Sequence, residues 1–124
     1  MHYIDAGIDT GDIIAQREIS IAATDTGETL YRKLEDASLM LFQETWPDVV
    51  SGTVARLRQP AEGTFHRTSD VQKIDHIELD REYSARYLID VLRSRTFGTY
   101  KSAYFVENGR KVYVRVTLEE EPTS

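Results

Sequence analysis

Hydrophobic residues recur along this chain with two different periods, which predict a strand followed by a long helix. Between Ile13 and Ile21 apolar and polar residues alternate among β-branched neighbours, as is typical of a strand. From about residue 25 to residue 46, apolar residues return every three or four positions and predict an amphipathic helix. The apolar face of this helix would hold Leu30, Leu34, Ala37 and Leu41. Asp25 with Glu28 predicts a capping box at its start, and Pro47 predicts a bend or restart near its end.

The second half of the chain carries signals for one further helix and a hairpin. Residues 53 to 75 indicate irregular or short-strand structure. Asp80 is expected to cap a second amphipathic helix. The buried face of that helix would hold Tyr83, Tyr87, Leu88, Val91 and Leu92. Asn108-Gly109 lies between two alternating runs and predicts a type I′ hairpin turn, in a register that places Phe105 opposite Val112.

The predicted order is loop, strand, helix, linker, helix and hairpin, within a chain of 124 residues, the length of one domain. This order predicts an α/β fragment, which would be an α+β structure as an isolated chain. A lone strand covered by one helix makes a poor sheet, and it suits the edge of a larger α/β sheet better. The chain is therefore expected to be the C-terminal piece of a larger domain, or to associate with itself.

Composition narrows the classes of partner. Fifteen basic and twenty-one acidic side chains give a net charge of −6, which disfavours a nucleic-acid partner because phosphates need clustered Lys and Arg. The absence of cysteine excludes disulfides and thiolate zinc sites. No apolar run reaches the roughly 18 residues of a membrane span, and no leader-like segment opens the chain. A soluble, cytoplasmic protein without a membrane partner is expected.

The opening loop, from His2 to Ile14, is Gly-punctuated and acidic, and its residues allow several interpretations. Asp9-Thr10-Gly11 is the tripeptide of aspartic proteases, but only eight residues precede it and two predicted helices follow it. A calcium loop counted from Asp5 would need Gly and Glu where Thr10 and Gln16 stand, so no metal site is expected. On composition alone, the simplest interpretation is a set of tight turns before a strand.

The extended string resembles the H-x-x-D-x-G-x-D-T-G-x-I loop of the folate-dependent formyltransferases. The spacing from His2 to Asp9, Gly7 and the Ile13-Ile14 pair all fit that pattern together. A looser similarity, closest to sugar N-formyltransferases, continues through most of the chain. It covers Asp25-Thr26, Gln59-Pro60, residues 63–66, residues 92–97 and residues 103–105.

The resemblance implies a fold and a division of the chain. Residues 1–58 would be the C-terminal portion of a formyltransferase catalytic domain, with the last strand and helix of its Rossmann-like fold. Residues 59–118 would form a helix plus β-hairpin extension, and residues 119–124 a disordered tail. The implied reaction moves a formyl group from 10-formyltetrahydrofolate to an amine, here most simply an amino sugar of a nucleotide sugar. A fragment of a methionyl-tRNA formyltransferase is the alternative within the family.

The resemblance also implies residue roles. Asp9 matches the family's catalytic aspartate, which orients and charge-stabilises a histidine base, while an asparagine stabilises the oxyanion. The loop would border the pterin ring of the folate through His2, Asp5, Gly7, Ile8, Thr10 and Gly11. The catalytic Asn and His have no counterpart here: Asn108 belongs to the hairpin, and neither His66 nor His76 has the surrounding motif.

The chain alone is therefore expected to be inactive, and whether it is an enzyme stays open at this point. Its expected partners are the folate and an amino-sugar nucleotide in a complete enzyme, with either a second copy or an N-terminal half completing the structure. A non-catalytic oligomerisation or regulatory module is the alternative from a different class. The tyrosines of the second half allow an aromatic platform for a nucleotide base, or simply core and interface packing.

Overall fold

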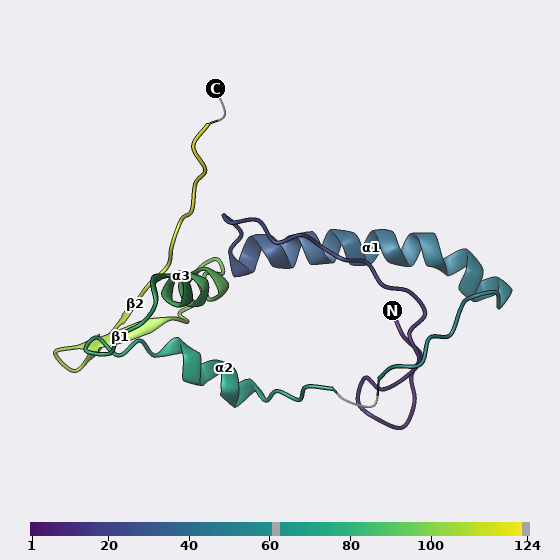
Figure 1. The fold of residues 1–124 in the computed structure, drawn as a ribbon, viewed down its shortest axis with the longest axis horizontal. Coiled ribbons are helices and arrows are strands. Elements are labelled where there is room, and N and C mark those ends of the chain that lie inside the picture. Colours follow the sequence, from purple (N-terminus) through teal and green to yellow (C-terminus); the bar gives the residue numbers. More distant parts are fainter. Residues whose placement is uncertain (61–62, 123–124) are drawn as a thin grey trace. The chain divides into compact units, whose positions relative to one another are not determined.

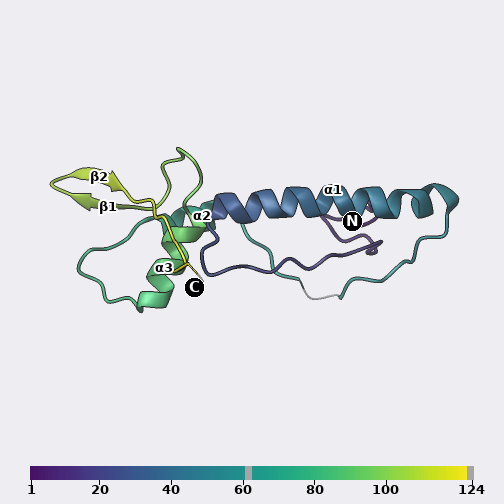
Figure 2. The same ribbon diagram turned by 90° about the horizontal axis from the view of Figure 1, so that it is seen from above.

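The computed structural model describes residues 1–60 and 63–122 as three helices and one two-stranded sheet (Figures 1 and 2). The helices are α1 (Gly27–Ser51), α2 (Thr68–Asp75) and α3 (Ala85–Ser94), and the strands are β1 (Tyr104–Glu107) and β2 (Arg110–Tyr113). The chain divides into two compact units. Unit 1 comprises Met1–Ser20 and Arg32–Phe65, and unit 2 comprises Ile21–Tyr31 and His66–Ser124. The predicted combination of helices with a terminal hairpin is confirmed, whereas the predicted domain boundary at residues 58 and 59 stays a prediction.

The predicted strand from Ile13 to Ile21 is wrong as a continuous element. Only Ile13 pairs in the manner of a strand, through isolated antiparallel bridges to His2 and Leu57. Ile13 and Leu57 exchange two backbone hydrogen bonds, of 2.7 and 2.9 Å. A strand needs a neighbouring backbone along its whole length. Alternating side chains are therefore insufficient here, because among the described residues the backbone partners of this segment, Met1, His2 and Leu57, reach it only between Ile13 and Ala15.

The start of α1 differs from the predicted capping box. Thr26 and Thr29 form the reciprocal pair: each backbone N–H donates to the other's hydroxyl, at 2.9 and 3.3 Å. Asp25 lies one residue earlier and is 7% exposed, and its carboxylate accepts from the Ala22 N–H and the Thr29 hydroxyl. The helix then continues through Pro47 to Ser51, so of the predicted alternatives, a bend or a restart at the proline, the restart does not occur.

The surface of α1 in unit 1 carries an exposed apolar stripe. Leu39, Phe42, Trp46 and Val50 are each 46% to 69% exposed, and their spacing places them along one side of the helix. The rings of Phe42 and Trp46 stack with their centroids 5.2 Å apart. Contiguous exposed apolar surface of this kind marks an interaction site more often than isolated residues do.

Helix α2 lies where irregular structure was predicted, so that prediction is wrong. The Asp70 carboxylate caps its start by accepting from the Arg67 N–H at 2.9 Å, and it also pairs with Lys73. The Arg67 N–H and the Lys73 ammonium lower the pKa of the Asp70 carboxyl. The helix is only eight residues long, and its two apolar residues, Val71 and Ile74, are too few to establish a helical period in the sequence.

Helix α3 begins later than predicted. Ser84 is its N-cap and accepts from the Tyr87 N–H at 3.2 Å, so Asp80 does not cap it. Asp80 lies in a turn that precedes the helix. The apolar face predicted for this helix is partly realised, since Val91 is only 8% exposed.

The predicted hairpin is confirmed in both turn and register. Asn108 and Gly109 have φ values of 50° and 74°, as a type I′ turn requires, and Phe105 pairs with Val112. Ala103 precedes β1 and is fully buried. His76 adds a parallel bridge to Tyr104 on the other side of β1, which extends the sheet locally.

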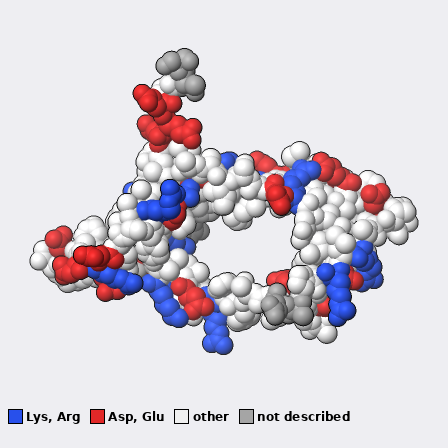
Figure 3. Space-filling view, in the orientation of Figure 1, with Lys and Arg blue, Asp and Glu red and all other residues white. Residues whose placement is uncertain are grey.

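The C-terminal segment after β2 has no regular structure over residues 114–122, and the last two residues of the predicted disordered tail lie outside the described residues. Its acidic run, Glu119 to Glu121, is visible as a red cluster in Figure 3. On the face shown there, blue side chains occur in small groups. Within the described residues, none of the helices has the length and apolar character needed to cross a membrane.

Candidate functional site

The loop from His2 to Thr10 encloses a recess of about 180 Å³ in unit 1. Its base is closed where the Tyr3 N–H donates to the Asp12 carbonyl at 2.9 Å and where His2 bridges Ile13. The lining residues are His2, Tyr3, Ile4, Asp5, Gly7, Ile8, Asp9 and Thr10. The structure therefore places six of the seven predicted site residues around one recess, while Gly11 lies buried behind it.

Asp5 organises the first half of the loop. Its Oδ1 accepts hydrogen bonds from the Thr10 hydroxyl at 2.6 Å and from the Gly7 N–H at 3.0 Å. These two donors, the hydroxyl first, hold the pKa of the exposed Asp5 carboxyl below its usual value of 3.8. Asp5 thus acts as an internal acceptor that closes the turn, and Gly7 allows the close approach because a Cβ there would lie 2.1 Å from Thr10 Oγ1.

Asp9 is presented to solvent at the tip of the loop. Its side chain is 84% exposed, and its Oδ1 lies 3.5 Å from His2 Nε2. His2 Nδ1 lies 2.9 Å from the Tyr3 carbonyl oxygen, which can only accept, so Nδ1 carries a proton. Nε2 is then a donor toward Asp9 only when the imidazole is protonated. The Asp9 carboxylate is consequently free to accept from a further group.

The backbone of the loop is under local constraint at Asp9 and Gly11. Asp9 has φ 56°, in the left-handed region that only Gly, Asn and Asp adopt with any frequency. Gly11 packs against Tyr3 so closely that a Cβ would lie 1.8 Å from the Tyr3 carbonyl oxygen. The backbone conformation of this turn therefore explains the Asp at position 9 and the Gly at position 11 without reference to chemistry.

Residues 56–59 support the loop from behind, and no local sequence pattern assigns any of them a role. The Arg56 guanidinium pairs with Asp12 at 3.2 Å and lies 4.1 Å from the centre of the Tyr3 ring. Gln59 Nε2 donates to the carbonyl oxygens of Asp9 and Gly11, at 2.9 and 2.6 Å. The sole sequence signal for this segment is the Gln59-Pro60 resemblance, because contacts across more than 40 residues leave no local pattern.

The other candidate catalytic groups have structural explanations within unit 2. Asn108 forms the hairpin turn, and His76 stacks on Tyr104 with the ring centroids 5.1 Å apart. Across residues 1–60 and 63–122, no group of three His, Asp or Glu side chains could hold a metal ion.

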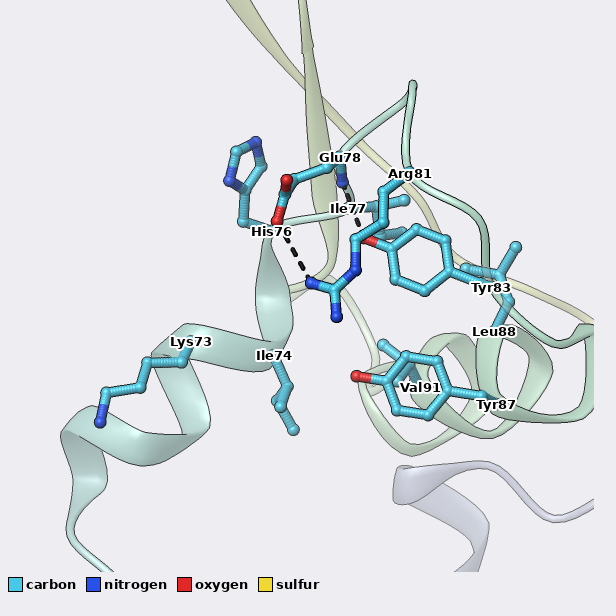
Figure 4. A pocket seen from close by; sticks show the side chains of 10 residues that line it. All are labelled: Lys73, Ile74, His76, Ile77, Glu78, Arg81, Tyr83, Tyr87, Leu88 and Val91. Atoms are coloured by element: carbon cyan, nitrogen blue, oxygen red, sulfur yellow. Dashed lines mark hydrogen bonds and ion pairs between the residues drawn. The ribbon is translucent and has the colours of Figure 1, made fainter.

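Unit 2 has a recess of its own, between α2 and α3, with a volume of about 80 Å³ (Figure 4). In it the Tyr83 hydroxyl accepts from the Glu78 N–H at 3.1 Å, while Arg81 pairs with the Glu78 carboxylate at 3.3 Å. The rings of Tyr83 and Tyr87 face each other with an interplanar angle of 4°. Ligand pockets usually span roughly 300 to 1,000 Å³, so this recess is too small to hold a nucleotide, and the aromatic platform for a base stays a prediction.

Comparisons with known proteins cover most of the chain. Residues 1–45 match the family model for formyl transferase, and residues 70–120 match that for the N-formyltransferase dimerization C-terminal domain. The chain is 32% identical over 122 residues to the dTDP-4-amino-4,6-dideoxyglucose formyltransferase of Mycobacterium bovis, covering 98% of this chain and 52% of that protein. Methionyl-tRNA formyltransferases are among the relatives as well. The chain thus spans about half the length of the first curated relative it matches.

Solved structures of formyltransferases are also similar to this chain. The 4-N formyltransferase of Francisella tularensis superposes with a TM-score of 0.91 and 31% identity, over 97% of this chain and 50% of that one. The formyltransferase PseJ of Anoxybacillus kamchatkensis is 42% identical over 58% of this chain and 38% of its own, with a TM-score of 0.55. The PseJ structure contains UDP-4,6-dideoxy-4-formamido-L-AltNAc and tetrahydrofolate.

Proposed function

Because this chain belongs to the formyltransferase family, we propose that its opening loop supplies Asp9 to a formyl-transfer site. The reaction would move the formyl group of 10-formyltetrahydrofolate onto the amino group of a nucleotide-linked sugar. The observation that carries the proposal is the exposed Asp9 carboxylate, 84% accessible and held at the tip of a constrained loop beside an open recess.

The chemistry assigned to Asp9 is electrostatic. In the proposed reaction the amine attacks the formyl carbon, and a histidine from another segment takes up the proton released by the amine. The bond between the formyl carbon and N10 of the folate then breaks, and tetrahydrofolate leaves with a proton on N10. A carboxylate beside that imidazole favours its protonated form and fixes its orientation. Asp9 suits this role because its contact with His2 is 3.5 Å long and leaves its side chain 84% exposed.

The recess is proposed to border the folate. Its mouth carries the exposed apolar side chains of Ile4 and Ile8, which suit a flat heteroaromatic ring better than water. His2, Asp5, Gly7, Thr10 and Gly11 would shape the loop backbone that faces this ring. Tetrahydrofolate in the PseJ structure supports a folate, and the 10-formyl form is the species that could donate a formyl group.

A nucleotide sugar is the preferred acceptor. The Mycobacterium bovis relative is named for a nucleotide-linked amino sugar, and the PseJ structure contains a nucleotide-linked formamido sugar. The net charge of −6 makes tRNA a poorer match, because tRNA binding depends on clustered basic side chains. Methionyl-tRNA is the competing acceptor within the family.

The exposed stripe of α1 is proposed to contact the segment that carries the missing catalytic groups. That segment is the formyltransferase region that relatives possess and that this chain does not match. The stripe of Leu39, Phe42, Trp46 and Val50 lies in the same unit as the Asp9 loop. Covering it would bury apolar surface at roughly 25 cal/mol per Å², a driving force for completing the site.

An assembly function is the second candidate, favoured by the match of residues 70–120 to a dimerization domain. The face of the hairpin that holds Tyr104, Val106 and Tyr113 would then contact a second copy of the chain. Tyr104 and Tyr113 lie across from each other in the register, with ring centroids 5.9 Å apart. Tyrosine is enriched at such interfaces. A cytoplasmic location is the expectation for either function.

Calorimetric titration with a stable tetrahydrofolate analogue tests the proposal. The chain is titrated alone and then mixed with the N-terminal half of a related sugar N-formyltransferase, and formyl transfer to dTDP-4-amino-4,6-dideoxyglucose is assayed in the mixture. Binding and turnover in the mixture support the proposal, and the N-terminal half alone is the control. A mixture that neither binds folate nor turns over would leave the assembly function as the better explanation.

A further inference from the structure

The side chain of Gln59 joins both ends of the Asp9 turn. Its Nε2 donates to the carbonyl oxygen of Asp9 at 2.9 Å and to that of Gly11 at 2.6 Å. A carbonyl oxygen can only accept, so both contacts require the amide nitrogen and use both of its hydrogens. The orientation of the Gln59 amide is therefore determined by its partners.

The turn that Gln59 holds is one that needs external support. Asp9 has φ 56°, a conformation that costs free energy for any residue with a Cβ. The Asp9 side chain contributes little to holding it, since it is 84% exposed and its His2 contact is long, at 3.5 Å. The bond to the Asp9 carbonyl restrains the Asp9–Thr10 peptide group, one of the two peptide groups that define this φ, and the bond to the Gly11 carbonyl holds the other end of the turn to the same amide.

Gln59 is itself held in place by its neighbours. Leu57 exchanges two backbone hydrogen bonds with Ile13, and Arg56 pairs with Asp12 at the base of the same loop. The segment can therefore act as a fixed support from which the amide reaches the turn. All of these residues belong to unit 1.

We infer that Gln59 is a positioning residue, which holds the Asp9 turn in its left-handed conformation and so presents the Asp9 carboxylate to its partner. The catalytic consequence rests on the proposed function, whereas the support of the loop does not. No signal within the loop itself indicates this role.

Amide hydrogen exchange measured by NMR on the full chain tests the support. In Gln59→Met, which keeps the length and removes the donor, exchange at the Tyr3 and Gly7 amides should accelerate roughly tenfold, as expected for loss of a net hydrogen bond. Gln59→Lys, which restores a donor of similar reach, should return exchange toward the original rate. Gln43→Met on α1 is the matched control, and the Leu41 amide in the interior of α1 reports unfolding of unit 1. If Gln59→Met loses protection at Leu41, Gln59→Glu replaces it as the variant without a donor.

Exchange at Tyr3 and Gly7 that stays within twofold of the original in Gln59→Met would overturn the inference. In the reconstituted enzyme, the positioning role further predicts that Gln59→Met lowers kcat at least tenfold with little change in KM for the nucleotide sugar, and that Gln59→Lys restores part of kcat. If exchange accelerates in Gln59→Met while Asp9→Asn keeps full turnover, the support of the loop by Gln59 stands and the proposed function is refuted. If exchange is unchanged in Gln59→Met while Asp9→Asn loses turnover, the proposed function stands and the support of the loop by Gln59 is refuted.

Discussion

His2 Nε2 lies 3.5 Å from Asp9 Oδ1, so the first and last parts of the opening loop face each other across its mouth. Because His2 Nδ1 donates to the Tyr3 carbonyl oxygen, the Nε2 atom attracts the carboxylate only in the protonated imidazole. This contact is long and leaves the Asp9 side chain 84% exposed. The carboxylate stays available to a second imidazole, which is the property a formyl-transfer site would use.

Substitution of Asp9 tests its catalytic role most directly. Asp9→Asn keeps the shape and tolerates the left-handed backbone, but it removes the charge that would stabilise an imidazolium. We expect kcat/KM of the reconstituted enzyme to fall by about 100-fold or more. Asp36→Asn on the exposed side of α1 is the control. Unchanged turnover in Asp9→Asn would show that Asp9 is not catalytic.

The titration of Asp5 tests the structure of the loop. Its folded-state pKa lies below 3.8 because the Thr10 hydroxyl and the Gly7 N–H bond to the carboxylate. A depressed folded-state pKa means that Asp5 stabilises the loop fully above its ordinary value, and that this contribution disappears as the pH falls through the lower value. Thr10→Val should raise the Asp5 pKa toward 3.8, and Thr10→Ser should leave it low, as followed by carboxyl carbon NMR. Equal pKa values in the two variants would contradict the hydrogen-bond geometry.

Gly11 should not tolerate a side chain. In Gly11→Ala the new Cβ would lie 1.8 Å from the Tyr3 carbonyl oxygen, so backbone must move. We expect the free energy of unfolding to fall by about 1 to 3 kcal/mol in urea denaturation, as for other overpacked sites. Gly63→Ala is the matched control, since nothing lies within 4 Å of the position that a methyl group would take there. Equal stability of the two variants would mean that the loop packs loosely enough around Gly11 to admit a methyl group.

The hairpin face tests the assembly function. If Tyr104 and Tyr113 contact a second copy, replacing both with Ser should weaken dimerisation at least tenfold in sedimentation, because buried aromatic residues dominate interfaces. Tyr100→Ser, at an exposed tyrosine before the hairpin, is the control. An intact dimer in the double variant would exclude this face as the interface.

The stripe on α1 tests how the site is completed. Leu39→Ser with Trp46→Ser should weaken calorimetric binding of the N-terminal half by roughly tenfold to a hundredfold, because each change removes apolar surface from the proposed contact. Asp48→Asn, at an exposed position on the opposite side of the same helix, should leave binding unchanged. A normal affinity in the double variant would place the contact elsewhere on the chain.

The sequence by itself determined the features that depend on neighbouring residues. Asn108-Gly109 specified the hairpin and its register, since a type I′ turn needs two residues that accept positive φ. The apolar period of residues 30 to 41 indicated α1 in the same way. The loop motif likewise identified the residues that meet around the recess, because they lie within ten positions of one another.

Tertiary contacts decided the rest. The alternation after Ile13 does not become a strand, because within the described residues its backbone partners Met1, His2 and Leu57 reach no farther along it than Ala15. The conformation of Asp9 likewise depends on Gln59, 50 residues away in the chain. These hydrogen bonds form between groups that only the folded chain brings together. They require no periodic pattern of apolar and polar residues, so the sequence does not reveal them.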